Sequence, residues 1–152
     1  MAAVVEATAR RVPPAAAWLG GLGLIPFVAG SILVVGTDLG WALDALRFYA
    51  ATILAFMGGV HWGLAIADHG SGPGAGSSWP RLGASVVPAL AGWLALLLPA
   101  TPGLLVLAAA FVLLLGGDLL AVRRGLAPAW YPWLRVPLTT IVALCLLVAA
   151  LG

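Results

Sequence analysis

Two ionisable side chains of this sequence stand inside long apolar runs. His61 lies in the run over residues 45–67, and Asp118 lies in the run over residues 103–122. A charged side chain in the middle of a membrane-spanning helix costs about 2.5–3.5 kcal/mol on insertion scales, so such groups usually face protein or water. A histidine titrates near neutral pH, so a histidine beside a carboxylate could relay protons or bind the polar head of a quinone or a lipid. The alternative is a polar lock that only fixes helix packing.

Two arginines are predicted at the same depth. Arg81 and Arg135 each stand directly before an apolar run. Successive spans alternate in direction, so the end of one span and the start of the next lie on the same side of the membrane. His61 and Asp118 lie near the ends of their spans, and Arg81 and Arg135 stand at the starts of the spans that follow. We therefore predict a polar cluster of the four side chains, in which Asp118 pairs with His61 or with an arginine.

The elements that must position this cluster are five apolar runs that fill most of the chain. Each is close to the ~20 residues that a helix needs to cross a ~30 Å hydrocarbon core. The predicted fold is an all-α polytopic membrane helix bundle in a single membrane domain over residues 1–152, with a short inside N-terminal segment over residues 1–14. The predicted transmembrane helices cover residues 15–35, 45–67, 82–98, 103–122 and 136–151.

Composition excludes a soluble domain. Charged residues make up 8% of the chain and hydrophobic residues 63%, whereas a soluble domain carries about 25% charged residues. The seven arginines form no patch, so nucleic-acid binding is not predicted. The single cysteine, Cys145, excludes an intrachain disulfide and a multi-cysteine metal site. Without a phosphate-binding loop or a hydrolase motif, we predict no catalytic residue, no metal ligand and no particular cofactor.

The arginines predict the orientation of the chain. With the N-terminus placed on one side, six arginines fall on that side and only Arg47 falls on the opposite side. Arg47 lies one helical turn from Asp44, and we predict that the two form an interfacial pair. The positive-inside rule then predicts a cytoplasmic N-terminus and a C-terminus on the outer side. The arginines on the N-terminal side are Arg10, Arg11, Arg81, Arg123, Arg124 and Arg135.

The second run carries a stripe of small residues at every fourth position. Such a face lets another helix approach closely, so we expect this helix to be the central and most buried one. The partner could be another part of this chain or a second copy, and self-association is therefore one prediction. The stripe consists of Ala51, Ala55, Gly59, Gly63 and Ala67.

Prolines inside the first and third runs predict kinks and suggest an internal repeat. Pro26 and Pro88 each remove a backbone donor, and the carbonyl oxygens so freed need other partners. Both prolines are followed at the same spacing by Ala-Gly. This pattern is compatible with a two-plus-two parallel repeat of helix pairs with a fifth helix added, as occurs in transporters.

Several segments resemble one known family. They are Gly58-Gly59-Val60-His61-Trp62-Gly63, the segment Ser85–Trp93, Asp118, and Leu134-Arg135-Val136-Pro137-Leu138-Thr139. These segments resemble the domain of unknown function 3429 family, the transmembrane protein 69-like family, over nearly the whole chain. The resemblance implies a bacterial inner-membrane protein but no reaction. In that membrane, the outward C-terminus predicted from the arginines would be periplasmic. Because its motifs coincide with the predicted cluster, Trp62 is counted with the candidate site.

Three function classes remain open from the sequence. The first is a non-enzymatic accessory or assembly subunit of a larger inner-membrane complex. The small size, the small-residue face and the aromatic residues between the fourth and fifth runs, Trp130, Tyr131 and Trp133, favour it. The second is a small transporter or a quinone- or lipid-binding protein centred on His61 and Asp118, and an enzyme is the third. A cavity that reaches His61 favours the second class, whereas a flat and exposed apolar helix face favours the first.

Overall fold

The first predicted span is two helices in the computed structural model, which describes residues 11–68 and 79–152. Helix α2 covers Pro14–Leu22 and α3 covers Ile25–Gly36. Pro26 stands in the first turn of α3, where the missing N–H would have no partner within the helix in any case. The helix is therefore interrupted just before Pro26. At the break, the carbonyl oxygen of Gly23 accepts a hydrogen bond of 3.0 Å from the Tyr49 hydroxyl. The expected kink is therefore a break between two helices, and a side chain of another helix supplies a hydrogen bond to a carbonyl oxygen at the break.

The remaining spans are single helices. They are α4 (Gly40–Asp68), α5 (Trp79–Leu97), α6 (Ala100–Arg123) and α7 (Tyr131–Leu151). In α5 the helix continues through Pro88, so Pro26 and Pro88 differ in local structure and the repeat stays a prediction. Within the described residues, five helical segments are long and apolar enough to cross a membrane. The all-helical fold with five spans is thus confirmed, with helix ends that extend up to five residues beyond the predicted ones.

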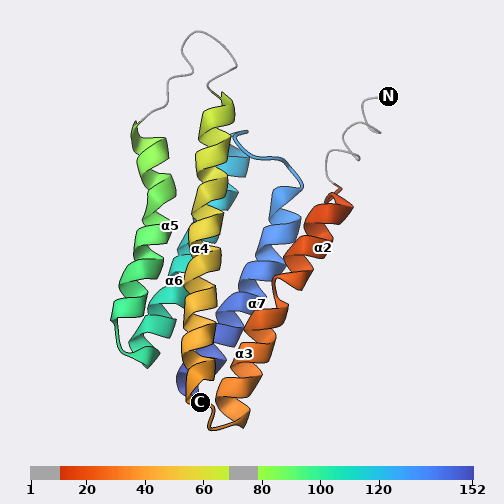
Figure 1. The fold of residues 1–152 in the computed structure, drawn as a ribbon. Coiled ribbons are helices and arrows are strands. Elements are labelled where there is room, and N and C mark those ends of the chain that lie inside the picture. The colour runs from red at the N-terminus through yellow and green to blue at the C-terminus, as the bar shows by residue number, and fades with distance from the viewer. Residues whose placement is uncertain (1–10, 69–78) are drawn as a thin grey trace.

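The helices alternate in direction, so the connections gather at two ends of the bundle (Figure 1). One end holds the start of α2, the end of α4, the start of α5 and the α6–α7 connection. We call it the arginine end because Arg11, Arg81, Arg123, Arg124 and Arg135 lie toward it. The other end holds the α3–α4 and α5–α6 connections and the C-terminus.

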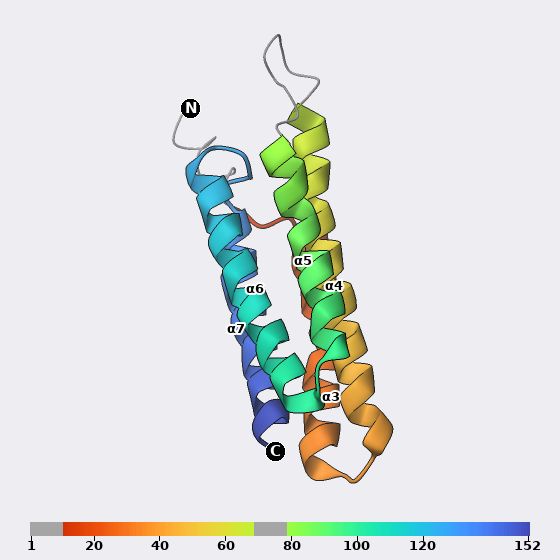
Figure 2. The same ribbon diagram turned by 90° about the vertical axis from the view of Figure 1, so that its left-hand side faces the viewer.

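Packing is closest within two helix pairs. Helix α4 lies along α5, and α6 lies along α7 (Figure 2). Helix α4 also contacts α3 and α6, while α7 contacts α2, α3 and α6. Helices α4 and α7 are buried to the same extent, which is the greatest among the spans. The predicted central place of α4 is therefore shared with α7.

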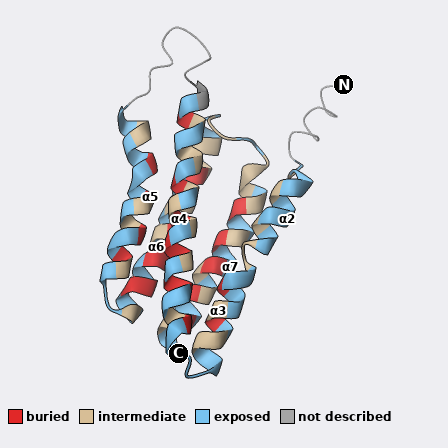
Figure 3. Ribbon diagram, viewed as in Figure 1, coloured by how far each residue is buried: buried red, intermediate tan, exposed pale blue. Residues whose placement is uncertain are grey.

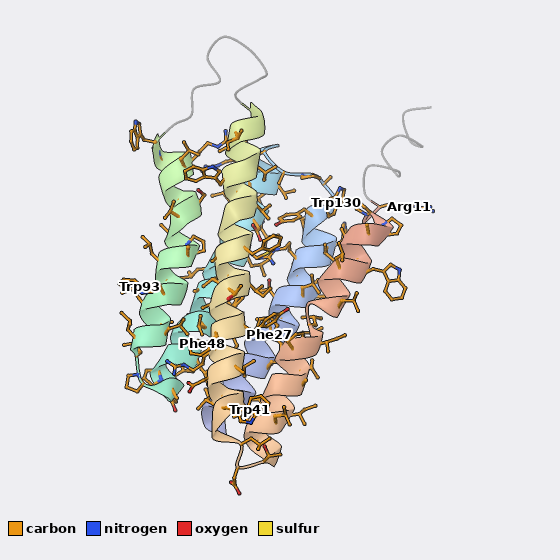
Figure 4. All side chains as sticks on the ribbon, in the orientation of Figure 1. Arg11, Phe27, Trp41, Phe48, Trp93 and Trp130 are labelled. Carbon is orange, nitrogen blue, oxygen red and sulfur yellow. The ribbon has the colours of Figure 1, made fainter. Side chains whose placement is uncertain are left out.

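The core forms where inward faces of α3, α4, α6 and α7 meet, and the outward faces remain exposed (Figure 3). Phe27 is 1% exposed and contacts the ring of Tyr49 at 5.0 Å and that of Phe111 at 6.0 Å between centroids, both edge-on. In Figure 4 Phe27 lies among the helices, whereas Trp93 points away from α5. Exposed large apolar side chains occur on every helix, as expected for a bundle surrounded by lipid.

Candidate functional site

Three helices bring one ionisable side chain each to a single point. Asp118 of α6 lies between His61 of α4 and Arg135 of α7. Its Oδ1 atom is 2.6 Å from His61 Nε2, and its Oδ2 atom is 2.6 Å from Arg135 Nε. Both oxygens of the carboxylate are therefore engaged. This arrangement contains both of the partners that the sequence proposed for Asp118, an arginine and His61.

Burial differs across these three side chains. Asp118 is 2% exposed and the Arg135 side chain 7%, while the His61 side chain is 22% exposed. A charge taken out of water is stable only if it is paired, so Asp118 and Arg135 depend on one another. A carboxylate only accepts hydrogen bonds, so His61 Nε2 carries the hydrogen. The other ring nitrogen, Nδ1, accepts a hydrogen bond when the ring is neutral and donates one when the ring is protonated.

Arg135 makes a further contact that the sequence did not predict. Its Nη1 atom lies 3.0 Å from Met57 Sδ, a weak acceptor on α4. Within the described residues, its Nη2 atom and the hydroxyl of Thr139, one turn along α7, are buried without a hydrogen-bond partner. Met57 is uncharged and belongs to no recognised motif, so nothing in the sequence indicated that it would contact Arg135. The contact fixes the Arg135 side chain between α4 and α6.

A groove reaches the exposed edge of His61. It lies between α4, α5 and α6, has a volume of about 360 Å³, and is lined mainly by apolar side chains. Its polar lining side chains are His61, Arg81, Ser85 and Arg124. Within the described part of the chain, no acidic residue lines it. The groove therefore combines an apolar wall with a cationic margin.

The predicted site residues do not all meet at Asp118. Arg81 lines the groove with His61 and is not among the described partners of Asp118. Trp62 does not line this groove and borders a separate hollow between α4 and α5, with Trp79 and Val86. Arg124, which the sequence used only to orient the chain, lines the groove. A one-residue step rotates a side chain by about 100° around a helix, which explains why His61 and Trp62 face different surroundings.

The small-residue stripe of α4 is only partly a contact within the chain. Ala51 is buried against Gly92 of α5, and Ala55 is half-buried. Gly59 and Gly63 are exposed, with nothing within 4 Å of a Cβ added at either position. Ala67 belongs to α4, but its side chain lies outside the described part. Steps of four residues drift by about 40° each, so the stripe turns away from α5.

Gly58 of α4 packs directly against α5. A Cβ at this position would lie 2.5 Å from the Ser85 carbonyl oxygen and 3.3 Å from the Pro88 ring. Gly58 therefore allows α4 and α5 to approach at the level of the cluster. The sequence showed the glycine pair but did not indicate which of the two faces α5.

Arg47, at the end opposite the cluster, is a helix cap. It is 7% exposed, and its Nη2 atom donates to the carbonyl oxygens of Ala95, Leu96 and Leu98, the last at 2.6 Å. Its distance to Asp44 is 3.4 Å, and the Asp44 side chain is 58% exposed. The last carbonyl groups of a helix have no partner within that helix. Arg47 thus satisfies the end of α5, and its pair with Asp44 is secondary.

The fold and the cluster define a polytopic α-helical membrane protein with an ion pair buried between its spans. The chain belongs to the family described as protein of unknown function DUF3429, whose model matches residues 12–151. It is also similar to transmembrane protein 69 of Xenopus tropicalis, with 39% identity over 139 residues. That match covers 87% of this chain and 52% of the relative, so the chain spans about half the length of that protein. No solved structure matches the chain.

Proposed function

We propose that this protein binds an amphipathic, lipid-like molecule in the groove between α4, α5 and α6, with the polar head of the molecule at His61. The observation that carries the proposal is the position of His61, which borders the groove while its Nε2 atom is held by Asp118. The carboxylate orients the ring, and Arg135 in turn fixes the carboxylate. The ring is therefore held in one position before a ligand arrives.

The length of the groove supports a ligand from one leaflet. Its lining runs from Arg81 to Ala91 along α5 and from Ala110 to Arg124 along α6. At 1.5 Å per residue these stretches are about 15 Å and about 21 Å long, which is about half and about two-thirds of a ~30 Å hydrocarbon core. The four polar side chains stand toward the arginine end, and the lining residues nearer the membrane centre are apolar or glycine. A lipid has the same order of head and tail.

The groove also has access from the bilayer. Val87 on the α5 side is 58% exposed and Leu113 on the α6 side is 76% exposed. Both line the groove and face outward, so a tail lying between them would continue into the surrounding lipid. A binding site of this form needs no alternating access, so we favour binding over transport.

We place the arginine end in the cytoplasm of a bacterial cell, with the protein in the inner membrane and the C-terminus in the periplasm. The distribution of arginine supports this orientation, because positive side chains are retained on the cytoplasmic side. The accessory-subunit role stays a prediction. It has less support from the geometry, because exposed apolar side chains occur on all helices rather than on one face.

Two neighbouring glycines provide a direct test. Gly117 lines the groove and Gly116 does not, and a Cβ added at either meets nothing within 4 Å. Gly117→Leu should fill the groove, and Gly116→Leu adds the same volume outside it. The tagged proteins would be purified in mild detergent, and bound small molecules would be identified by native mass spectrometry and organic extraction.

We expect one tightly held amphipathic molecule in the unmodified protein and in Gly116→Leu, and its loss in Gly117→Leu. Equal thermal melting of the two variants would show that the loss is not due to unfolding. A molecule retained by both variants would place the binding site elsewhere. A stoichiometric protein partner, with no small molecule, would instead favour the accessory-subunit role and reduce the cluster to a packing feature.

A further inference from the structure

We propose that the molecule in this groove has an uncharged head group that donates hydrogen bonds through hydroxyl groups, as a lipid alcohol does. This inference rests on the proposed function and specifies the chemistry of its ligand. The observation that carries it is that His61 and Ser85 both line the groove, while each already donates a hydrogen to another part of the protein. These two side chains therefore offer lone pairs to an occupant.

His61 offers the lone pair of Nδ1. Its Nε2 hydrogen is directed at Asp118, whose negative charge Arg135 already balances. The cluster is thus electrically neutral when the His61 ring is neutral, and in that ring Nδ1 is a hydrogen-bond acceptor. Within the described residues Nδ1 has no hydrogen-bond partner, and it is not a fully buried atom. A donor in the groove can therefore reach it.

Ser85 offers a second acceptor at nearly the same level. Its Oγ atom donates to the carbonyl oxygen of Leu82 at 2.6 Å, which uses the single hydroxyl hydrogen and leaves a lone pair. A Cβ at Gly58 would lie 2.5 Å from the Ser85 carbonyl oxygen. Because His61 follows Gly58 by less than one turn, His61 and Ser85 lie within about one turn of the same level of the groove.

The depth of these two acceptors favours an uncharged head. The second span ends at Ile66, five residues beyond His61, and the third begins at Trp79, six residues before Ser85. At 1.5 Å per residue the two side chains start about 8 Å and about 9 Å inside the span ends. A charged head would leave water to reach them, whereas a hydroxyl needs only a hydrogen-bond partner. Arg81 has a further interaction of its own, so we give it no role toward the occupant.

The apolar part of the groove distinguishes a lipid alcohol from a free polyol. Twelve of the sixteen lining residues are apolar, glycine or proline. A small polyol would leave that wall without contact, whereas an apolar chain would cover it. A glycerol lipid with free hydroxyls and a reduced quinone both join hydroxyl groups to such a chain. The shared chemistry is the hydroxyl donor, and the experiment separates the two sources.

The test uses two serines with the same local structure. Ser31 and Ser85 are both buried, and each donates to the carbonyl oxygen three residues before it, at 3.0 Å and 2.6 Å. Ser85 lines the groove and Ser31 does not. Ser85→Ala therefore removes an acceptor from the groove, and Ser31→Ala removes an equivalent hydroxyl elsewhere. His61→Leu removes the other acceptor and leaves Asp118 paired with Arg135.

The probes differ in their hydroxyl hydrogens. The full chain, in a neutral maltoside detergent, would be titrated with hexadecylglycerol and with its dimethyl ether, which has the same chain but no hydroxyl. Decylubiquinol and decylubiquinone form the corresponding quinone pair. Phosphatidylcholine would serve as the charged head without a hydroxyl, and glycerol as the free polyol. Native mass spectrometry would follow binding.

We expect hexadecylglycerol to bind about tenfold more tightly than its dimethyl ether, because the ether leaves buried acceptors without a donor. Ser85→Ala should weaken hexadecylglycerol binding about fivefold and leave ether binding unchanged. His61→Leu should give the same selective loss, and Ser31→Ala should change neither affinity. Gly117→Leu should abolish binding, while Gly116→Leu should retain it. A preference confined to decylubiquinol over decylubiquinone would identify the lipid alcohol as a quinol.

Other outcomes would overturn the inference in distinguishable ways. Equal affinities within both probe pairs, or equal losses in Ser85→Ala and Ser31→Ala, would show that no hydroxyl donor is recognised. Strong binding of glycerol would replace the lipid by a soluble polyol. Tightest binding of phosphatidylcholine, lost in Gly117→Leu, would reject the uncharged head while leaving the proposed function intact. If no probe bound and Gly117→Leu changed nothing, both proposals would fail.

Discussion

Asp118 and Arg135 form an ion pair that is almost completely buried and joins α6 to α7. The Oδ2–Nε distance is 2.6 Å, and the two side chains are 2% and 7% exposed. Either charge alone would be costly in such surroundings, because several kcal/mol are lost when an ion leaves water. The same carboxylate holds His61 at the groove. The pair therefore links the packing of α6 and α7 to the proposed binding site.

The ion pair should show strong coupling in a double-mutant cycle. Asp118→Leu alone leaves the Arg135 charge buried, and Arg135→Leu alone leaves the Asp118 charge buried. Each should lower the free energy of unfolding by about 3–5 kcal/mol. The double variant should lose much less than the sum, because no charge is left unpaired. Reversible unfolding in mixed detergent micelles would measure the four free energies, and additive losses would show that the pair is not coupled.

The contact of α4 with α5 should depend on Gly58 and not on Gly59. A Cβ at Gly58 would lie 2.5 Å from a backbone oxygen of α5, whereas a Cβ at Gly59 would meet nothing within 4 Å. Gly58→Ala should cost about 1–3 kcal/mol of the free energy of unfolding through overpacking. Gly59→Ala serves as the matched control, because the change in helix propensity is the same. Equal stabilities of the two variants in thermal melts would contradict the close approach of α4 to α5 at Gly58.

Arg47 should contribute to stability as a cap rather than as an ion-pair partner. Arg47→Leu removes the donor to three carbonyl oxygens at the end of α5. Unsatisfied buried acceptors cost about 1–3 kcal/mol each, so a total loss of about 3 kcal/mol is expected after partial relaxation. Asp44→Asn should change the unfolding free energy by less than about 1 kcal/mol, as is typical of exposed pairs. If Asp44→Asn were as damaging as Arg47→Leu, the ion pair would be the important interaction.

The proposed orientation can be tested by labelling from one side. In a Cys145→Ser background, Thr101→Cys marks the α5–α6 end and Ala129→Cys marks the α6–α7 connection. Both positions are exposed and lie at opposite ends of the bundle. A membrane-impermeant maleimide added to intact spheroplasts, whose outer membrane is open, should label only Thr101→Cys. Labelling of Ala129→Cys alone would reverse the orientation and place the groove on the outer side.

The depth of the cluster could be predicted from the sequence because it depends on distances along the chain. A helix advances a fixed rise per residue, so the positions of His61, Asp118 and Arg135 within their spans follow from where each span begins. The direction of each span follows from alternation. These two rules place the three side chains at one level, and the structure brings them into contact.

Direction around each helix was less predictable. Gly58 faces α5 and Gly59 faces away, and His61 lines the groove while Trp62 does not. Adjacent residues differ in this way because each step turns by about 100°. Which face turns inward depends on the neighbouring helices. In a membrane the lipid-facing side of a helix is as apolar as the buried side, so hydrophobicity does not distinguish them. The hydrogen bond at the break before Pro26 was likewise not predictable, because its donor, Tyr49, lies on a different helix.

The sequence by itself therefore determined the class of protein, the five spans, their alternation and the level of the polar residues, because these depend on length, hydropathy and rise per residue. Only the tertiary structure decided that Asp118 binds both His61 and Arg135, that Arg47 caps α5, and that Arg81 and Arg124 face one groove. Those contacts depend on how α4–α5 packs against α6–α7. That packing results from the shapes of many side chains acting together, and no local pattern records it.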